Sequence, residues 1–523
     1  MQPTLKTRPL VLSGFMATGK TTCGRALAGR CGVPFVDVDE EIEREANRSI
    51  ADIWAAEGEP GFRAREQAAI SRILEARAPA VIAVGGGALV DGATRRRVLD
   101  RAIVVTLEAD VDTILARASA GAVRPNLGGP DPRARAVSLL LARREAYAEA
   151  HAVMRTDDVD VDTVVDACHR LWTEDPLLLP LGARSHAITF VRNKPNRLTD
   201  ALATLGPSGV VVVTDSNVHR ARHAWLDAAL APLAIEPVVV TLPPGEPNKT
   251  LATVGTIWDA ALGAGIDRDA VVLAWGGGVP CDMAAFAAST LLRGLRLVAA
   301  PTSLLGMVDA SVGGKTGFDH AAGKNLIGSF WQPSQVVIDV DHLATLPTRE
   351  RAAGLAEVVK IALALDAGLL DTLDAARGAW RTLPPEDLLP VIRRAVELKI
   401  RVVSDDERES STRAILNLGH TIGHALEAAT GFARHLHGEA VAIGLVAELE
   451  AGVRRGVTPA ALATRIRHLL AAIGLPTDAA PGELARARAF LHADKKRAGG
   501  RIRLPVVTEA GRVTMDSVGL AAI

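Results

Sequence analysis

The sequence is poor in aromatic residues, which make up 3% of its 523 residues and include a single tyrosine, Tyr147. Because alanine, valine and leucine dominate instead, we expect hydrophobic cores built of aliphatic side chains. An excess of charge of one sign is also missing: 59 lysines and arginines stand against 60 acidic residues, a net charge of −1. No overall field therefore favours nucleic acid or an anionic membrane, and any phosphate site must be built locally.

Cysteine is scarce, and long apolar runs are missing. The four cysteines, Cys23, Cys31, Cys168 and Cys281, include no CxxC pair, which indicates a reducing, cytoplasmic setting. No uncharged apolar run reaches about 18 residues, so we expect no membrane span. The chain is long enough for roughly two to four domains.

A phosphate-binding motif stands near the N-terminus. Residues 14–21 read GFMATGKT, which satisfies GxxxxGK[ST], between a predicted buried strand at 9–13 and a predicted helix at 22–30. This context is the one the motif needs, because loop N–H groups and a helix N-terminus face the phosphates. Lys20 would reach the terminal phosphates, and the Thr21 hydroxyl would ligate Mg²⁺. The alternative is a glycine-rich turn without a ligand, and the matching context argues against it.

Further strands are predicted in the first third of the chain. In a strand at residues 33–39, the alternate acids Asp37 and Asp39 would point the same way at the strand end. One would serve Mg²⁺ and the other a hydroxylated substrate, and a solvated turn is the alternative. Two more strands are predicted at residues 80–84 and 103–107, the first running into three glycines that permit close approach of a ligand.

Taken together, these motifs resemble the shikimate kinase family over roughly residues 8–172. The resemblance rests, in chain order, on GFMATGKTT, DVDEEIE, GEPGFRARE, GGG, RPNL and RxxxY. The family has a small P-loop α/β fold like that of nucleoside-monophosphate kinases, with a parallel sheet. It transfers the γ-phosphoryl group of ATP to the 3-hydroxyl of shikimate.

The resemblance implies roles for particular residues of the first third. ATP and Mg²⁺ would be held by Gly14, Gly19, Lys20, Thr21, Thr22, Asp37 and Arg124. Shikimate would be held by Asp39, Arg63, Gly86 and Arg143. Three of these would be catalytic, namely Lys20, Asp39 and the lid arginine Arg124. Two features depart from the family pattern: Asn126 replaces a leucine in the RPNL lid, and Arg144 is a second candidate partner for the shikimate carboxylate.

A domain boundary is predicted at residues 173–185, which carry two prolines and a glycine and have no clear period. Such a composition is typical of a linker. We therefore expect a kinase domain at residues 1–172, and a second region from residue 186 onwards.

The second region begins with signs of a dinucleotide site. A predicted buried strand at residues 209–214 ends at Asp215, an acid placed to bind ribose hydroxyls; a helix-capping aspartate is nearly as good an interpretation. A second buried strand at 271–275 runs into the glycines 276–278, where backbone can approach a pyrophosphate. Because this triple glycine is not GxGxxG, the signal is weak by itself.

Lysines beside glycines follow, at residues 311–316 (SVGGKT) and 323–325 (GKN). Backbone exposed beside a lysine suits anion binding. Each lysine alone is equally well explained as part of a solvated face, but as an ordered set they are harder to dismiss.

Four of the 13 histidines fall within residues 417–439, NLGHTIGHALEAATGFARHLHGE. His420 and His424 share one face of a predicted helix, and His435 and His437 follow. Three neutral donors and an acid from elsewhere in the chain would hold a divalent metal. Histidines satisfied by ordinary hydrogen bonds are the alternative.

This set resembles the 3-dehydroquinate synthase family over roughly residues 186–523. The motifs are PGEPNKT, GGG, ASVGGKTG, GKNLIGSFWQP, TLPTRE, AGLAEVVK, NLGHTIGHALE, HLHGEAVAIG and DKK. The family converts 3-deoxy-D-arabino-heptulosonate 7-phosphate to 3-dehydroquinate and phosphate, using NAD and a divalent metal, usually Zn²⁺ and alternatively Co²⁺. The resemblance implies a Rossmann-like NAD-binding α/β part at residues 186–340, and an α-helical metal- and substrate-binding part at 341–523.

By motif, the metal ligands would be Glu357, His420 and His437, with His424 as a substrate contact. NAD would contact Asp215, Asn217, Glu246, Lys249, Gly277, Gly278, Asp282, Thr302, Ser303, Lys315, Lys324 and Thr345. The heptulosonate phosphate would contact Arg293, Asp309, Lys315, Lys324, Asn325, Lys360, Lys399, Arg413, Asn417, His424 and Lys495. Of these, Lys315, Lys360, Lys399, Asn417 and His424 would be catalytic.

One motif departs from the pattern GGGVxGDxxGF of this family. Cys281 and Ala285 stand in this chain where glycines are usual, and Pro280 stiffens the turn, although Asp282 is kept. The departure puts the local loop geometry and the affinity for NAD in question.

Two alternatives differ from this reading. A P-loop kinase fused to a metal-dependent polyol dehydrogenase would act on a small neutral substrate, which does not need Lys315, Lys324, Lys399 and Arg413 together. A regulatory nucleotide-binding module on an inactive scaffold would have lost catalytic positions that are all present here. We expect small-molecule substrates, no nucleic acid or membrane partner, and a homodimer formed through the second region.

Overall fold

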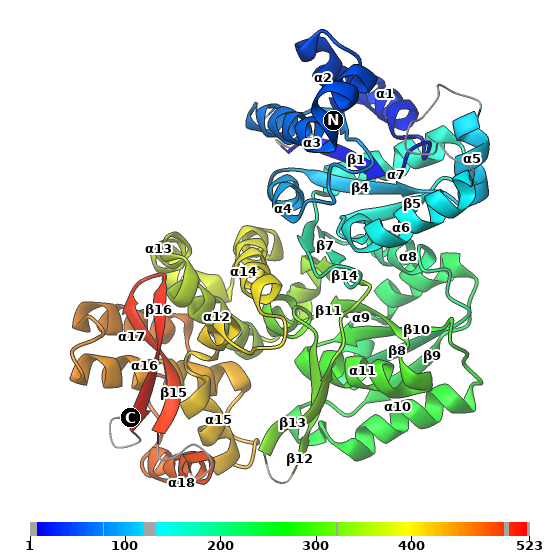
Figure 1. The fold of residues 1–523 in the computed structure, drawn as a ribbon. Coiled ribbons are helices and arrows are strands. Elements are labelled where there is room, and N and C mark those ends of the chain that lie inside the picture. The colour runs from blue at the N-terminus through cyan, green and yellow to red at the C-terminus, as the bar shows by residue number, and fades with distance from the viewer. Residues whose placement is uncertain (1–7, 77, 120–130, 321–322, 496–500, 520–523) are drawn as a thin grey trace. The chain divides into compact units, whose positions relative to one another are not determined.

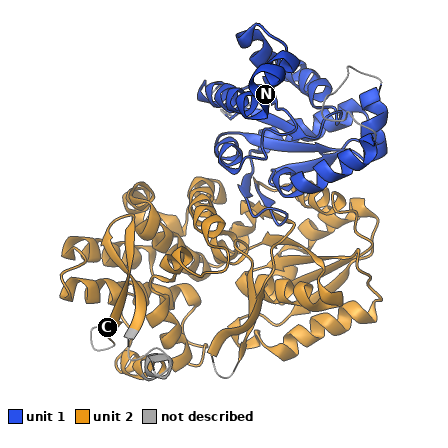
Figure 2. Cartoon of the chain, viewed as in Figure 1, with its two compact units in different colours: residues 1–189 blue, residues 190–523 orange. Residues whose placement is uncertain are grey.

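The computed structural model describes residues 8–76, 78–119, 131–320, 323–495 and 501–519. The chain divides into two compact units, residues 1–189 and 190–523 (Figure 2). The division falls inside β7 (His186–Val191), which pairs antiparallel with the buried strand β6 (Leu177–Leu179). The residues predicted as a linker therefore include a short strand. Within the described ranges, no helix has both the length and the apolar character that crossing a membrane requires.

Unit 1 is built on a five-stranded parallel sheet of order β2-β3-β1-β4-β5. Alternate residues of β1 point into two cores: Leu10 and Leu12 pack with α1 and α7, while Val11 packs with α3 and α4 on the other face. Both faces are thus covered, as parallel sheets require. The strands are β1 (Leu10–Gly14), β2 (Phe35–Asp37), β3 (Val81–Ala83), β4 (Ile103–Glu108) and β5 (Ala152–Arg155). The helices are α1 (Lys20–Cys31), α2 (Val38–Ala46), α3 (Ile50–Glu75), α4 (Gly92–Arg101), α5 (Val111–Ser119), α6 (Pro132–Ala148) and α7 (Val161–Glu174).

The second strand ends earlier than predicted. β2 stops at Asp37, whose carboxylate accepts a hydrogen bond from the backbone N–H of Asp39 (3.1 Å) and caps α2. The prediction of a strand extending to Asp39 is therefore wrong, and Asp39 lies in the first helical turn. The physical reason is that a capping aspartate satisfies N–H groups that have no partner inside a helix.

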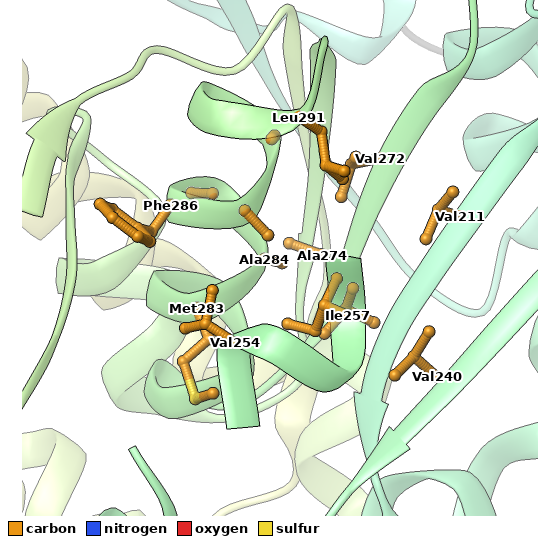
Figure 3. Close-up of a cluster of buried hydrophobic side chains, with 14 of the residues drawn as sticks. Val211, Val240, Val254, Ile257, Val272, Ala274, Met283, Ala284, Phe286 and Leu291 are labelled. Atoms are coloured by element: carbon orange, nitrogen blue, oxygen red, sulfur yellow. The ribbon is translucent and has the colours of Figure 1, made fainter. Parts of the chain in front are cut away.

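Unit 2 begins with parallel strands in the order β14-β11-β10-β8-β9 (Figure 1). Figure 3 shows one face of this sheet, where Val211, Val240, Val272 and Ala274 meet aliphatic and a few larger side chains of α10 and α11. The opposite face packs against α8 and α9. The strands are β8 (Val210–Asp215), β9 (Val238–Leu242), β10 (Val271–Gly276), β11 (Arg296–Pro301) and β14 (Gln335–Asp339), and the helices are α8 (Pro195–Ala203), α9 (Ser216–Leu230), α10 (Leu251–Gly263) and α11 (Gly278–Thr290). The predicted α/β class is confirmed.

The rest of unit 2 is mainly helical, as predicted. Its helices are α12 (Thr348–Leu365), α13 (Ala367–Ala376), α14 (Pro385–Asp405), α15 (His420–Ala429), α16 (His437–Arg454), α17 (Ala460–Ile473) and α18 (Glu483–Lys495). Two antiparallel ribbons accompany these helices, β12 (Lys315–His320) with β13 (Gly323–Phe330), and β15 (Arg501–Glu509) with β16 (Arg512–Gly519).

Glycines let α16 pack tightly against two other helices. A Cβ added at Gly438 would stand 1.9 Å from the carbonyl oxygen of Ala353 on α12. A Cβ added at Gly444 would stand 2.0 Å from the carbonyl oxygen of Gly419, the residue that caps α15. Only glycine fits at contacts this close. The packing brings the N-terminal ends of α15 and α16 together beside the middle of α12.

Candidate active sites

A cavity of about 590 Å³ lies in unit 1, between the loop that follows β1 and the glycines that follow β3. Parallel α/β sheets bind ligands in this position, beyond the carboxyl ends of their strands. The lining includes predicted site residues, namely Gly19, Lys20, Thr21, Thr22, Asp37, Asp39, Arg63, Gly86 and Arg143.

The side chain of Lys20 is held by the phosphate loop itself. Lys20 Nζ donates to the carbonyl oxygens of Gly14 (2.9 Å) and Phe15 (2.8 Å), so its side chain lies along the loop. Thr21 Oγ1 donates to Asp37 Oδ2 at 3.0 Å. The hydroxyl and the carboxylate predicted to serve Mg²⁺ are therefore neighbours.

Asp39 faces the cavity from the start of α2. Its Oδ1 is buried and has no hydrogen-bond partner among the described residues. Burial, and then the charge of Asp37, raises the pKa of Asp39, although Lys20 and Arg63 act in the opposite direction. A buried carboxylate with a raised pKa is well suited to receive a hydrogen bond, or a proton, from a substrate hydroxyl.

Of the two candidate arginines on α6, Arg143 lies at the cavity. Its guanidinium donates to the carbonyl oxygen of Gly86 at 2.8 Å, and the Tyr147 hydroxyl donates to the same oxygen at 2.5 Å. Arg144 is exposed and is not among the cavity residues. Arg124 and Asn126 of the predicted lid lie outside the described residues.

The polar cavity residues Glu66, Arg117 and Thr156 were missed by the sequence analysis. Glu66 is 1% exposed and accepts from Arg63 at 2.6 Å, and its helical spacing of three from Arg63 was a usable signal. Arg117 donates to the carbonyl oxygen of Thr156 at 2.6 Å. No local pattern joins Arg117 to Thr156, because they meet only through the fold.

In unit 2, the predicted metal ligands come together from three helices. Glu357 on α12 is fully buried, and its Oε1 lies 3.6 Å from His420 Nε2 at the start of α15 and 3.6 Å from His437 Nε2 at the start of α16. Its other oxygen is paired with Lys360. His424 belongs to the same group, since ligand atoms of the three histidines all lie within 4.8 Å of one another. By contrast, the imidazole of His435 faces Glu483, with Nε2 lying 3.3 Å from Oε2 of that residue.

These residues fit a divalent metal. Burial, followed by the charges of Lys360 and His437, lowers the pKa of His420 well below its usual value. Burial and the neighbouring imidazoles likewise lower the pKa of His424. Metals bind the neutral imidazole, so the low pKa values of His420 and His424 favour binding, whereas the charge of Glu427 outweighs burial and raises the pKa of His437. A carboxylate oxygen and imidazole nitrogens around one point are donors that suit Zn²⁺ and Co²⁺.

A connected polar network joins several predicted NAD contacts. Lys249 is 2% exposed and donates to Asp282 Oδ2 at 2.5 Å and to Asn325 Oδ1 at 2.7 Å. Lys324 pairs with Glu246 at 2.8 Å. Residues from the connection between β9 and α10, from α11 and from β13 thereby meet in one place, although these segments are far apart in the sequence.

Other predicted NAD contacts flank the strand ends. Asp215 caps α9 by accepting from the N–H groups of Asn217 (2.8 Å) and Val218 (3.1 Å), as the capping interpretation expects. Gly277 caps α11, and a Cβ added there would lie 3.4 Å from Ser303 Oγ. That distance is an ordinary van der Waals contact, so the backbone at Gly277 is not tightly enclosed. Buried Thr302 follows β11, and Thr345 ends the short helix η6 (Val340–Thr345).

The structure accommodates Pro280, Cys281 and Ala285, the residues that depart from the family pattern after β10. A Cβ added at Gly276 would stand 2.6 Å from the ring of Pro280, so the proline closes over the strand end. Cys281 and Ala285 are buried in the core between α11 and the sheet. The turn between β10 and α11 therefore forms despite the departure from the family pattern.

The predicted substrate residues gather positive charge around η5 (Gly306–Ala310). Lys399 on α14 donates to the carbonyl oxygen of Asp309 at 2.6 Å and pairs with its carboxylate. Lys315 pairs with Glu409, and Asn417 donates to the same carboxylate. Burial, followed by the charges of Arg413 and Lys399, lowers the pKa of Lys315 to about 8. Concentrated cations of this kind suit a substrate with several negative charges.

The side chain of Arg413 is held by a hydrogen bond to the backbone of Gly313. Its guanidinium donates to the carbonyl oxygen of Gly313 at 3.0 Å, where a Cβ would stand 2.4 Å from the arginine Nη2. Gly313 also has a φ of 104°, a conformation that side chains disfavour. Arg293, in contrast, is exposed at the end of the short helix η4 (Leu291–Arg293), and the side chain of Lys495 lies outside the described residues.

Two acids near the histidines were not singled out by the sequence analysis. Glu427 Oε1 lies 3.3 Å from His437 Nδ1 and accepts from Lys324 at 2.9 Å. Glu448 Oε2 accepts from the N–H of Gly419 at 2.7 Å, where α15 begins. The helical repeat places Glu427 near His424, but its contact with His437 arises from the packing of α15 on α16.

Residues 239–353 match the family model described as 3-dehydroquinate synthase N-terminal, residues 354–497 match its C-terminal counterpart, and residues 16–171 match shikimate kinase. The 3-dehydroquinate synthase of Bordetella pertussis is 46% identical over 320 residues, which cover 61% of this chain and 89% of that protein. This chain belongs to the 3-dehydroquinate synthase family. Ahead of that region it carries a shikimate kinase domain.

Two further relatives agree with the synthase assignment. The 3-dehydroquinate synthase of Citrifermentans bemidjiense is 42% identical over 323 residues, or 62% of this chain and 89% of that protein. Among solved structures, a 2-epi-5-epi-valiolone synthase from Streptomyces hygroscopicus, with NAD⁺ and Zn²⁺ bound, has a TM-score of 0.59 and 29% identity, covering 64% of this chain and 93% of that one. The 3-dehydroquinate synthase fold and the shikimate kinase family, both predicted from the sequence, are confirmed.

Proposed function

We propose that the chain is a bifunctional enzyme: unit 1 phosphorylates shikimate with ATP, and unit 2 converts 3-deoxy-D-arabino-heptulosonate 7-phosphate to 3-dehydroquinate and phosphate. One observation carries the synthase assignment at the level of chemistry. Glu357 Oε1 is equidistant, at 3.6 Å, from Nε2 of His420 and of His437, beside a cluster of buried lysines. The family assignment supports the same conclusion.

The cofactors of the proposed synthase are NAD and Zn²⁺ or Co²⁺. Glu357, His420 and His437 would hold the metal, which supplies Lewis-acid polarisation of substrate hydroxyls when bound. NAD supplies reversible hydride exchange, and the network around Lys249 would hold it. The presence of NAD⁺ and Zn²⁺ in the related valiolone synthase supports this choice.

In this proposal, the residues of the chain bind and orient a highly charged substrate. Lys315, Lys399 and Arg413 would receive its carboxylate and phosphate, and their positive charge would stabilise negative charge that develops as phosphate leaves. Lys315, whose pKa is lowered to about 8, can hold or release a proton near neutral pH. His424, kept neutral by burial, can accept a hydrogen bond or a proton from a substrate hydroxyl.

In the proposed kinase, catalysis is mostly a matter of positioning and charge neutralisation. Lys20 would contact the terminal phosphates of ATP, and Thr21 with Asp37 would hold Mg²⁺. Arg63 and Arg143 would bind the shikimate carboxylate, while Asp39 would accept a hydrogen bond from the attacking hydroxyl. The cavity of unit 1 supports these roles, because all six of these residues line it.

Two assays on the full chain test the proposal. We expect phosphate release from the heptulosonate phosphate when NAD⁺ and Zn²⁺ are present, and ADP formation from ATP when shikimate is present. NAD⁺-dependent oxidation of glycerol without phosphate release would instead favour the polyol dehydrogenase. The positive charge around Lys315 and Lys399 argues against a small neutral substrate.

We infer that the protein works in the cytoplasm on small molecules, as a homodimer formed through unit 2. Its four cysteines are unpaired thiols, which supports a reducing setting. Analytical ultracentrifugation of the chain and of residues 190–523 tests the dimer. A monomer in both samples would contradict it.

A further inference from the structure

We propose that Glu427 is a positioning residue that fixes the imidazole of His437, and that Lys324 holds Glu427 in place for this purpose. The proposal rests on the metal site proposed above. The two ring nitrogens of His437 face different groups. Nε2 lies 3.6 Å from Glu357 Oε1, whereas Nδ1 lies 3.3 Å from Glu427 Oε1 and 3.5 Å from Oε2.

This arrangement determines which nitrogen of His437 can bind a metal. A carboxylate only accepts hydrogen bonds, so Glu427 favours the tautomer with the proton on Nδ1. The lone pair then lies on Nε2, which points towards Glu357. A carboxylate behind an imidazole also makes the imidazole a stronger donor to a metal.

His420 is held by a different kind of group. Its Nδ1 lies 3.2 Å from the backbone carbonyl oxygen of Leu418, while its Nε2 faces Glu357. Both imidazoles therefore turn Nε2 towards Glu357, but Nδ1 faces a neutral carbonyl in His420 and a carboxylate in His437.

The carboxylate of Glu427 is itself built into the site. It is 3% exposed, and a buried carboxylate needs a partner to offset the loss of hydration. Lys324 supplies that partner, donating to Glu427 Oε1 at 2.9 Å and pairing with Glu246 at 2.8 Å. Lys324 lies on β13 and Glu246 in the loop after β9. The series Glu246, Lys324, Glu427 and His437 thus joins the predicted dinucleotide site to the metal ligand.

A purely structural role for Glu427, as the counter-ion of Lys324, makes a different prediction. Removing the carboxylate would then lower the stability of the metal-free protein without changing the metal site. A positioning role predicts weaker metal binding and an altered electronic environment of the metal, even in a folded protein.

The test uses Co²⁺ alone, added to metal-free full-length protein. Affinity is measured by competition with a chelator, and coordination by the visible absorption of Co²⁺. For Glu427→Ala we expect binding to weaken by roughly 10- to 100-fold, the usual effect of losing such a partner. For Glu427→Gln, whose amide oxygen can still accept from Nδ1, we expect a smaller loss and a shifted spectrum.

Glu483→Gln is the matched control. Glu483 is also a buried carboxylate beside a histidine nitrogen, since it lies 3.3 Å from His435 Nε2, but that histidine does not face Glu357. We expect wild-type Co²⁺ affinity and spectrum for this variant. Wild-type affinity and spectrum in folded Glu427→Ala would overturn the proposal, and if that variant does not fold, the same result in Glu427→Gln would overturn it. Failure of the wild-type protein to bind Co²⁺ would instead overturn the metal site itself.

The role of Lys324 is tested by a double-mutant cycle on the same affinity. We expect Lys324→Gln to weaken Co²⁺ binding, and to have little further effect in the Glu427→Gln background, because it acts through the carboxylate. Equal effects of Lys324→Gln in both backgrounds would overturn this part of the proposal.

Discussion

His437 Nε2 and Glu357 Oε1 lie 3.6 Å apart, although the two residues sit on separate helices, α16 and α12. Their approach depends on Gly438, which follows His437 and leaves no room for a side chain against Ala353. A Gly438→Ala substitution therefore moves α16 away from α12. We expect this variant to lose bound Zn²⁺ while keeping kinase activity, as measured by metal analysis and the two assays. Full retention of Zn²⁺ would show that the close helix packing does not build the site.

His424 and His437 have different predicted roles despite their proximity. We expect His437→Ala to lose bound metal, and His424→Ala to keep it while phosphate release falls sharply, because His424 is predicted to contact substrate. Metal content per chain and the rate of phosphate release distinguish the two variants. Loss of metal from both would assign His424 to the coordination sphere, which its position among the three imidazoles also allows.

Lys20→Ala is expected to abolish ATP-dependent phosphorylation of shikimate, since its ammonium would no longer reach the terminal phosphates. Phosphate release by the synthase should be unchanged. Arg25→Ala is the control on the same helix: Arg25 is a half-exposed residue that pairs with Glu40 and does not line the cavity. Normal kinase turnover in Lys20→Ala would reject the kinase assignment.

The two neighbouring arginines of α6 should differ in their effect on shikimate binding. Loss of a charged hydrogen bond costs about 1.5–3 kcal/mol, so we expect Arg143→Ala to raise the KM for shikimate by roughly 10- to 100-fold. Arg144 is exposed outside the cavity, and Arg144→Ala should leave this KM almost unchanged. The reverse order in steady-state kinetics would exchange their assignments.

Glu448 makes the stability of unit 2 depend on pH. Burial raises the pKa of its carboxyl from 4.5 to about 8, although the N–H of Gly419 acts in the opposite direction. Above pH 4.5 the unfolded chain releases this proton more readily than the folded one, so the group's contribution to stability is lost as pH rises towards 8. We expect Glu448→Gln, which cannot ionise, to gain stability over wild type between pH 5 and pH 8, as seen in the melting temperature of unit 2. A difference that does not change with pH would contradict this account.

The sequence predicted much of each site, because the residues involved lie in short motifs. The phosphate loop around Lys20 and the pair His420 and His437 were identified from local spacing together with family resemblance. Asp39 was placed on a strand because residues 33–39 were predicted as one strand, whereas the Asp37 side chain caps a helix there. Propensity could not decide between these two possibilities, since an aspartate near a strand end is also a good helix cap.

What the sequence could not predict was contact between residues that meet only through packing. The sequence could not identify Glu427 as a partner of His437. The two residues meet because α15 packs closely on α16, and this packing depends on the contact of Gly444 with Gly419. The pairing of Arg117 with Thr156 in unit 1 has the same origin. From the sequence alone, Pro280 and Cys281 put the turn geometry in question. In the structure, Cys281 is buried in the hydrophobic core and the ring of Pro280 packs over Gly276.

The most direct test of the central claim is anomalous X-ray diffraction from crystals of the protein grown with Zn²⁺ and NAD⁺. We predict one strong zinc peak in unit 2, within about 2.0–2.2 Å of a carboxylate oxygen of Glu357 and of Nε2 of His420 and His437. A zinc peak that these three residues do not share would contradict the account.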